Sequence, residues 1–158
     1  MVEGIIAGEI PEEAIWEKAT VFLQRWGVQA PQEAMGFLRD QGWGISRIDE
    51  PNDLHQYVVT RPIQPGEEKA PVVRLRKVLS GTTRLSVAVE GIDDEDRSPT
   101  FVRLSKPNRM ELRGDHIYFA RIHTVNGVVK ERSFEFGLDG SIKPNYQPGG
   151  GLLEEFGG

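Results

Sequence analysis

The sequence predicts an α+β protein: two short N-terminal helices followed by an antiparallel β-sheet of about six to eight strands with hairpin or meander connections. Apolar residues follow helical spacing only before Gly42, and after it they alternate with polar residues. Turn signals such as Asn-Gly and Asp-Gly also become frequent after that point. We expect an N-terminal arm (residues 1–10), a single domain (residues 11–144) and a flexible glycine-rich tail (residues 145–158).

The two predicted helices begin at prolines and end at glycines. The first runs from Pro11 to Gly27 and the second from Pro31 to Gly42, since proline suits the first turn of a helix and glycine its end. The residues expected on the buried face of the first helix are Ile15, Ala19, Phe22 and Trp26, with Leu23 beside them. Those expected for the second are Ala34, Phe37 and Leu38. We expect the two helices to cover the sheet.

Strands are expected where alternating residues are bounded by turn signals. The predicted strand segments are 43–45, 54–61, 73–79, 85–90, 101–105, 109–113, 117–125 and 128–136. Residues 62–71 are rich in proline and are expected to form an exposed loop, and the acidic run at residues 93–96 a solvated one. A further turn is expected at Asp139-Gly140, with no regular structure from Pro144 onward.

The Asn126-Gly127 pair predicts a two-residue type I′ turn, which fixes the register of its hairpin. The facing pairs are then Val125 with Val128, His123 with Lys130, Arg121 with Arg132, Phe119 with Phe134, and Ile117 with Phe136. All ten side chains share one sheet face. One end of this face is apolar, and the other carries a candidate site for an anion or a partner, formed by Arg121, His123, Lys130 and Arg132.

Like charges directly opposite one another destabilise a strand pair, so something acidic is expected to offset this cationic group. One candidate is internal, the loop at residues 93–96 folding over the cations. Another is external: an anionic ligand, nucleic acid or the acidic surface of a partner. In the third, the long side chains extend into water and nothing binds. If an anion binds, its affinity should fall steeply with salt and be lost in an Arg121→Ala, Arg132→Ala double variant.

Composition restricts the classes of function. The chain has no cysteine, which excludes disulfides, thiol catalysis and thiolate metal sites. A net charge of -5 argues against a nucleic-acid partner. The sequence has no signal-peptide pattern and no apolar run long enough for a membrane, so a cytoplasmic location or one within an assembled particle is expected. The three histidines (His55, His116 and His123) lack metal-site spacing, and no metal or cofactor is predicted.

Three minority hypotheses assign a chemical or nucleic-acid function. The first is an isomerase-like or cyclase-like enzyme that uses Asp115-His116 and Tyr118, with a pocket between helices and sheet lined by Trp16, Trp26, Tyr118 and His116. The second is a winged-helix nucleic-acid binder, whose recognition helix would carry Gln32, Glu33 and Asp40 against a single Arg39. The third is a carrier protein activated at Gly157-Gly158.

The leading hypothesis is a non-enzymatic assembly or adaptor subunit of a larger complex, such as a virion. It assigns no catalytic residue, because the sequence contains no nucleophile elbow and no phosphate-binding loop. The tail residues Leu152, Leu153 and Phe156 form an apolar group in a glycine-rich segment. We expect these three residues and the N-terminal arm to dock on neighbouring subunits.

Overall fold

The computed structural model describes residues 10–50, 54–78 and 83–145. Residues 1–9 of the expected arm and residues 146–158 of the expected tail lie outside this part. The chain begins with helices α1 (Glu12–Arg25) and α2 (Gln32–Asp40). The strands that follow are β1 (Gly44–Glu50), β2 (Leu54–Thr60), β3 (Val72–Val78), β4 (Arg84–Asp93), β5 (Pro99–Ser105), β6 (Arg109–Arg113), β7 (His116–Val125), β8 (Val128–Gly137) and β9 (Ser141–Asn145). The predicted α+β class is confirmed, with a somewhat higher strand count.

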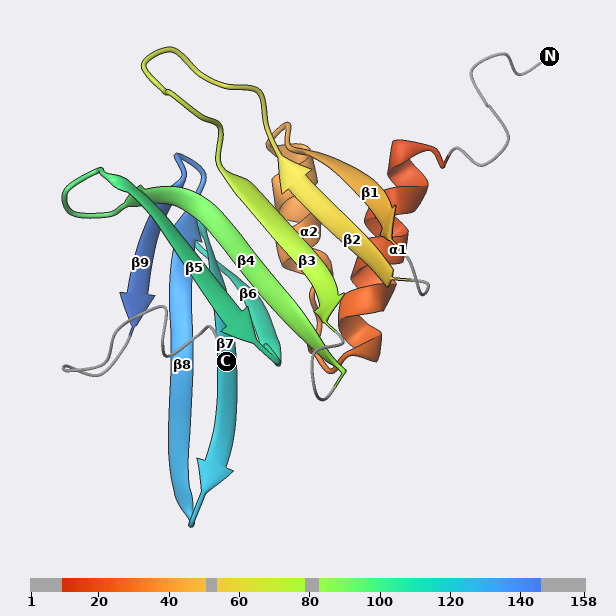
Figure 1. The fold of residues 1–158 in the computed structure, drawn as a ribbon, viewed down its shortest axis with the longest axis vertical. Helices are drawn as coiled ribbons and strands as arrows, with labels where there is room; N and C mark the ends of the chain where they lie inside the picture. The colour runs from red at the N-terminus through yellow and green to blue at the C-terminus, as the bar shows by residue number, and fades with distance from the viewer. Residues whose placement is uncertain (1–9, 51–53, 79–82, 146–158) are drawn as a thin grey trace.

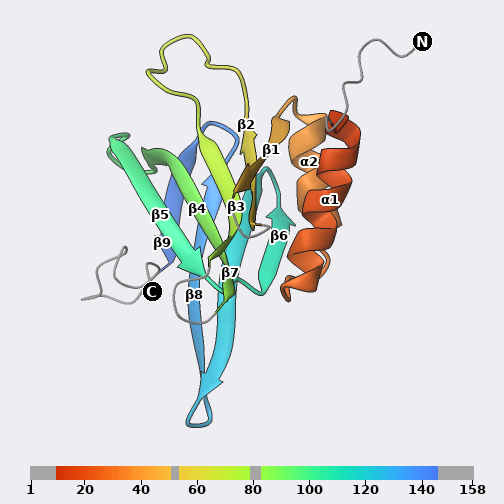
Figure 2. The ribbon, with the colours of Figure 1, turned by 45° about the vertical axis from the view of Figure 1, so that its right-hand side comes forward.

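All nine strands belong to one sheet, and eight of them lie in the order β1-β2-β3-β4-β9-β8-β7-β6. Strand β5 lies outside this order and pairs with β4 along the edge opposite β3. Every pairing is antiparallel except the short one between β4 and β9. Helix α1 packs on β1 and helix α2 on β6, so the helices cover the side of the sheet between its two edge strands (Figures 1 and 2).

The inner face of the sheet and the helices enclose one hydrophobic core. Its largest fully buried side chains include Phe119, Phe134 and Phe136, and Trp43 packs edge-on against Phe136 at 5.5 Å between ring centroids. Burial of these large apolar side chains supplies the main driving force for folding. Neither described helix has the length and apolar character needed to cross a membrane.

The helices bury most of the predicted residues, Ile15, Ala19 and Leu23 in α1 and Ala34 and Leu38 in α2, but differ at their aromatic positions. In α1 the deeply buried aromatic residue is Trp16, whereas Phe22 and Trp26 are only partly buried at the margin of the core. In α2, Met35 is buried and Phe37 is partly buried. Phe22 and Trp26 instead lie beside a hollow between α1 and the end of the sheet.

Strand β9 was not predicted. It is short and contains Pro144, both of which argue against a strand. Its position is set by its neighbours, because residues 142–145 pair with β8 and residues 141–142 pair with the end of β4. Tertiary pairing thus determines this strand, which local sequence does not indicate. The expected loop at residues 62–71 has no helix or strand, as predicted.

Candidate functional site

The hairpin of β7 and β8 has the predicted register. Asn126 and Gly127 have φ angles of 51° and 78°, the positive values that a type I′ turn requires at both central residues. Val125 faces Val128, and each of the other predicted pairs is observed. Phe119 and Phe134 stack with their ring centroids 5.2 Å apart, which confirms that they share one sheet face.

One end of this hairpin face lies in the core, and the other projects from the body of the sheet (Figures 1 and 2). The projecting part brings together the four predicted site residues, hereafter the basic cluster: Arg121, His123, Lys130 and Arg132. Beyond them, three valines near the turn are exposed to 42%, 55% and 69%: Val125, Val128 and Val129. The hairpin end therefore combines cationic groups with exposed apolar side chains.

The described residues do not supply an acidic partner for every cation of the basic cluster. Burial and then the neighbouring cations Arg121, Arg132 and Lys130 lower the pKa of His123. The Nδ1 atom of His123 is buried and has no hydrogen-bond partner among the described residues. Within the same part of the chain, Arg121 and Lys130 form no ion pair. The described residues thus leave these two cations without an acidic partner.

The acidic loop, residues 93–96, does not fold over the basic cluster. It connects β4 to β5 and lies toward the opposite end of the molecule from the hairpin turn (Figures 1 and 2). Asp93 pairs with Ile142 of β9, and Ile142 pairs with Phe136 of β8. Along β8, Phe136 is four residues, or about 13 Å, away from Arg132. The internal offset considered above is therefore wrong for a single copy of the chain.

Two carboxylates of the acidic loop are used within the loop, and two are free to act outside it. Asp93 Oδ1 accepts hydrogen bonds from the backbone N–H groups of Glu95 and Asp96. Asp96 Oδ1 accepts from Ser98, and these bonds lower the pKa of Asp96. The side chains of Asp94 and Glu95 are exposed and have no partner within the described part of the chain.

The predicted acid/base residues contact neighbouring side chains and do not line the cleft described below. His116 Nδ1 lies 2.7 Å from Asp115 Oδ1, and Tyr118 donates a hydrogen bond to Glu131 at 2.7 Å. Burial, then this bond, raises the pKa of Tyr118 to about 12, which makes it a poor proton donor near neutral pH. Because His116 and Tyr118 alternate with core residues of β7, both point to the outer face of the sheet.

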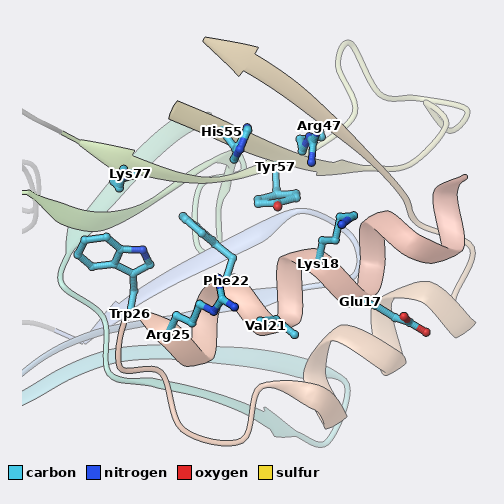
Figure 3. A pocket seen from close by; sticks show the side chains of 10 residues that line it. All are labelled: Glu17, Lys18, Val21, Phe22, Arg25, Trp26, Arg47, His55, Tyr57 and Lys77. Carbon is cyan, nitrogen blue, oxygen red and sulfur yellow. The ribbon is translucent and has the colours of Figure 1, made fainter. Parts of the chain in front are cut away.

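A cleft lies instead between α1 and the end of the sheet formed by β1, β2 and β3, with a volume of about 520 Å³ (Figure 3). Of the four residues predicted to line a pocket, only Trp26 borders it. Trp16 is buried in the core, and His116 and Tyr118 lie elsewhere. The predicted lining is therefore wrong, although a cleft between helix and sheet exists.

Aromatic and cationic side chains form the walls of this cleft (Figure 3). The aromatic ones are Phe22, Trp26 and Tyr57. The cationic ones are Lys18, Arg25, Arg47 and Lys77, and Glu17 is the one acidic residue among the described residues that line the cleft. Sequence reasoning missed this site because Arg47 and Lys77 come from separate strands, and Lys18 and Arg25 look like ordinary solvated helix residues. The sequence did contain one signal of this site. In β1 and β2, Arg47 and His55 occupy positions at which strand alternation would place core residues.

Neither metal ligands among the described residues nor similarity to a known protein indicates a function. Among residues 10–50, 54–78 and 83–145, no three side chains of the metal-ligating type gather at one place. Comparisons of the chain with protein-family models, with curated proteins and with solved structures find no match.

Proposed function

We propose that this protein is a non-enzymatic assembly subunit whose copies associate head to tail, with the basic cluster of one copy docked on the acidic loop of the next. One observation carries the proposal. The acidic group that should offset the basic cluster exists in the chain but lies toward the other end of the molecule (Figure 1). It can therefore meet the cluster of a second copy but not that of its own.

The chemistry of both surfaces supports this contact. Asp94 and Glu95 are exposed carboxylates, and Arg121 and Lys130 are cations with no acidic partner in the described part of the chain. The exposed valines at the hairpin turn would lose apolar surface to the neighbour.

A contact between different surfaces of identical copies is heterologous, so it propagates into a ring or a filament. Reversing the charge of one surface should break it. We expect the double variant Arg121→Glu, Lys130→Glu to sediment as a monomer under conditions in which the wild-type protein associates. The double variant Asp94→Lys, Glu95→Lys should behave in the same way, because each variant then carries like charges on both surfaces.

Mixing the two variants provides the decisive control. In the mixture, each reversed surface of one variant faces an oppositely charged surface of the other, so sedimentation velocity should show association again. The variant pair Lys69→Glu, Arg103→Glu changes exposed cations outside both surfaces and should associate like the wild-type protein. Unchanged association of both reversed variants, or no recovery on mixing, would contradict the proposed contact.

The tail is a second element of the proposed assembly. Residues Leu152, Leu153 and Phe156 lie outside the described residues, and their support is the apolar cluster in the sequence. Deleting residues 146–158, which leaves β9 complete, is expected to lower the native mass. An unchanged mass would remove the tail from the proposal and leave the contact between hairpin and acidic loop intact.

A further inference from the structure

We infer that the cleft between α1 and strands β1, β2 and β3 binds a small organic anion that carries an aromatic ring. This site is separate from the surfaces proposed for assembly, and its residues have no role in that proposal. Its volume of about 520 Å³ is in the range of clefts that hold small molecules. The inference comes from the chemistry of its walls and from the way the protein holds them.

The aromatic walls come from two elements that meet across the cleft. Phe22 of α1 and Tyr57 of β2 have ring centroids 5.3 Å apart with planes inclined by 49°. Trp26, the residue directly after the end of α1, is only partly buried and has Lys77 Nζ 5.9 Å from its ring centroid. Trp26 thus presents an accessible ring surface beside a cation. A flat ring of a ligand can stack on such a surface.

The charge of the cleft is opposite to that of the whole chain. Among the described residues, four cationic side chains and one carboxylate line it, and of the four cations Arg47 is paired with Asp49, although the chain as a whole has a net charge of -5. Lys18 and Arg25 form no ion pair within the described part of the chain, so their charges are available to a ligand. A phosphate or carboxylate would accept charge-assisted hydrogen bonds from these groups.

Part of the cationic wall is held in place before any ligand arrives. Arg47 Nε lies 2.9 Å from Asp49 Oδ1, and the same carboxylate contacts His55 Nδ1 at 2.8 Å. Arg47 shares the inner sheet face with the core residue Ile45 of β1, and His55 shares it with Tyr57 and Val59 of β2. Because these polar side chains cannot join the core, the end of the sheet stays open toward α1. An ordered guanidinium group loses less conformational freedom on binding.

The two halves of the wall define the ligand class. An inorganic anion would leave the aromatic surface unused, and an uncharged ring would leave the cations without a partner. A ligand with both parts satisfies both. Nucleoside monophosphates and aryl carboxylates share this chemistry, and they differ in the anionic group. Adenosine monophosphate is a suitable probe for the phosphate class, and indole-3-acetate for the carboxylate class. Adenosine and indole are their uncharged counterparts.

Calorimetric titration of the full-length chain tests the inference. At least one of the two anionic probes should bind with a Kd of about 1 mM or tighter, and its uncharged counterpart about tenfold more weakly or not at all. Inorganic phosphate should also bind more weakly than adenosine monophosphate. Binding of adenosine monophosphate alone would assign the phosphate class, and binding of indole-3-acetate alone the carboxylate class. No binding by either probe, or equal binding by the uncharged counterparts, would overturn the inference.

Matched variants locate the binding. The exposed pair Lys18→Ser, Arg25→Ser should weaken affinity about tenfold or more, since each cation contributes a charge-assisted hydrogen bond. The pair Lys69→Ser, Arg103→Ser removes the same charge from exposed sites outside the cleft and should bind like the wild-type protein. Trp26→Leu should lower the affinity for the anion that carries a ring more than the affinity for inorganic phosphate. Equal losses in both serine pairs would mean a nonspecific charge effect and would overturn the inference.

Discussion

Replacing Gly91 with alanine is expected to lower the free energy of unfolding by about 3 kcal/mol or more, because a side chain at this position meets fixed backbone. Gly91 lies at the end of β4, where the strand stops pairing with β3 and begins to pair with β9. A Cβ atom there would overlap the carbonyl oxygen of Gly140 and come within 3.2 Å of Ile142 Cδ1. That carbonyl oxygen accepts a hydrogen bond from Ile92, so it cannot move without breaking the junction.

Gly36 is the matched control for this substitution. It lies inside α2, and a Cβ atom there would meet nothing within 4 Å. Gly36→Ala should therefore raise the free energy of unfolding by about 0.5–1 kcal/mol, through the higher helix propensity of alanine. Denaturant titration of both variants measures the difference. Wild-type stability of Gly91→Ala would show that the β4–β9 junction is not as close as described.

Glu67→Gln is expected to destabilise the protein by about 2–3 kcal/mol, because it leaves a buried guanidinium group without its counter-charge. The Arg61 side chain is 5% exposed, and its Nη1 and Nη2 atoms donate to the two carboxylate oxygens of Glu67 at 2.8 and 2.6 Å. Its Nε atom donates to the carbonyl oxygen of Leu138, which ties the β2–β3 loop to β8 and β9. The exposed neighbour Glu68 offers the control Glu68→Gln, expected within about 0.5 kcal/mol of wild type.

The same carboxylate predicts the response to acid. Its hydrogen bonds with Arg61 and then with the backbone of Gln64 lower the pKa of Glu67 from 4.5 to about 2. A lowered pKa in the folded state contributes stability above the unfolded value of 4.5, and this contribution is lost as pH falls toward 2. Between these values, the stability of Glu67→Gln should depend less on pH than that of the wild-type protein. Parallel pH profiles in denaturant titrations would contradict this assignment.

The predictions from sequence were most accurate where turn signals and strand alternation agree. Asn126-Gly127 fixed one turn, and that turn determined every facing pair out to Ile117 and Phe136. It therefore also brought the four residues of the basic cluster together. The helices were found from their prolines, glycines and apolar spacing, although Phe22 and Trp26 were placed deeper in the core than they are.

The remainder depends on tertiary arrangement. Strand β9 forms because it pairs with both β8 and β4. Its Pro144 argues against a strand when the local sequence is considered alone. The distance between the acidic loop and the basic cluster follows from that same arrangement, which the sequence does not encode locally. The cleft likewise requires residues from α1, β1, β2 and β3 to meet, and no spacing along the chain relates Arg25 to Lys77.

Native mass in solution tests the proposed assembly most directly. Sedimentation equilibrium or light scattering of the wild-type chain at low salt should give a mass above the 17.7 kDa of one copy, rising with protein concentration. Salt screens the contact between acidic loop and basic cluster, so about 0.5 M NaCl should return the mass toward that of a monomer. A mass of 17.7 kDa at every concentration and salt level would contradict head-to-tail assembly.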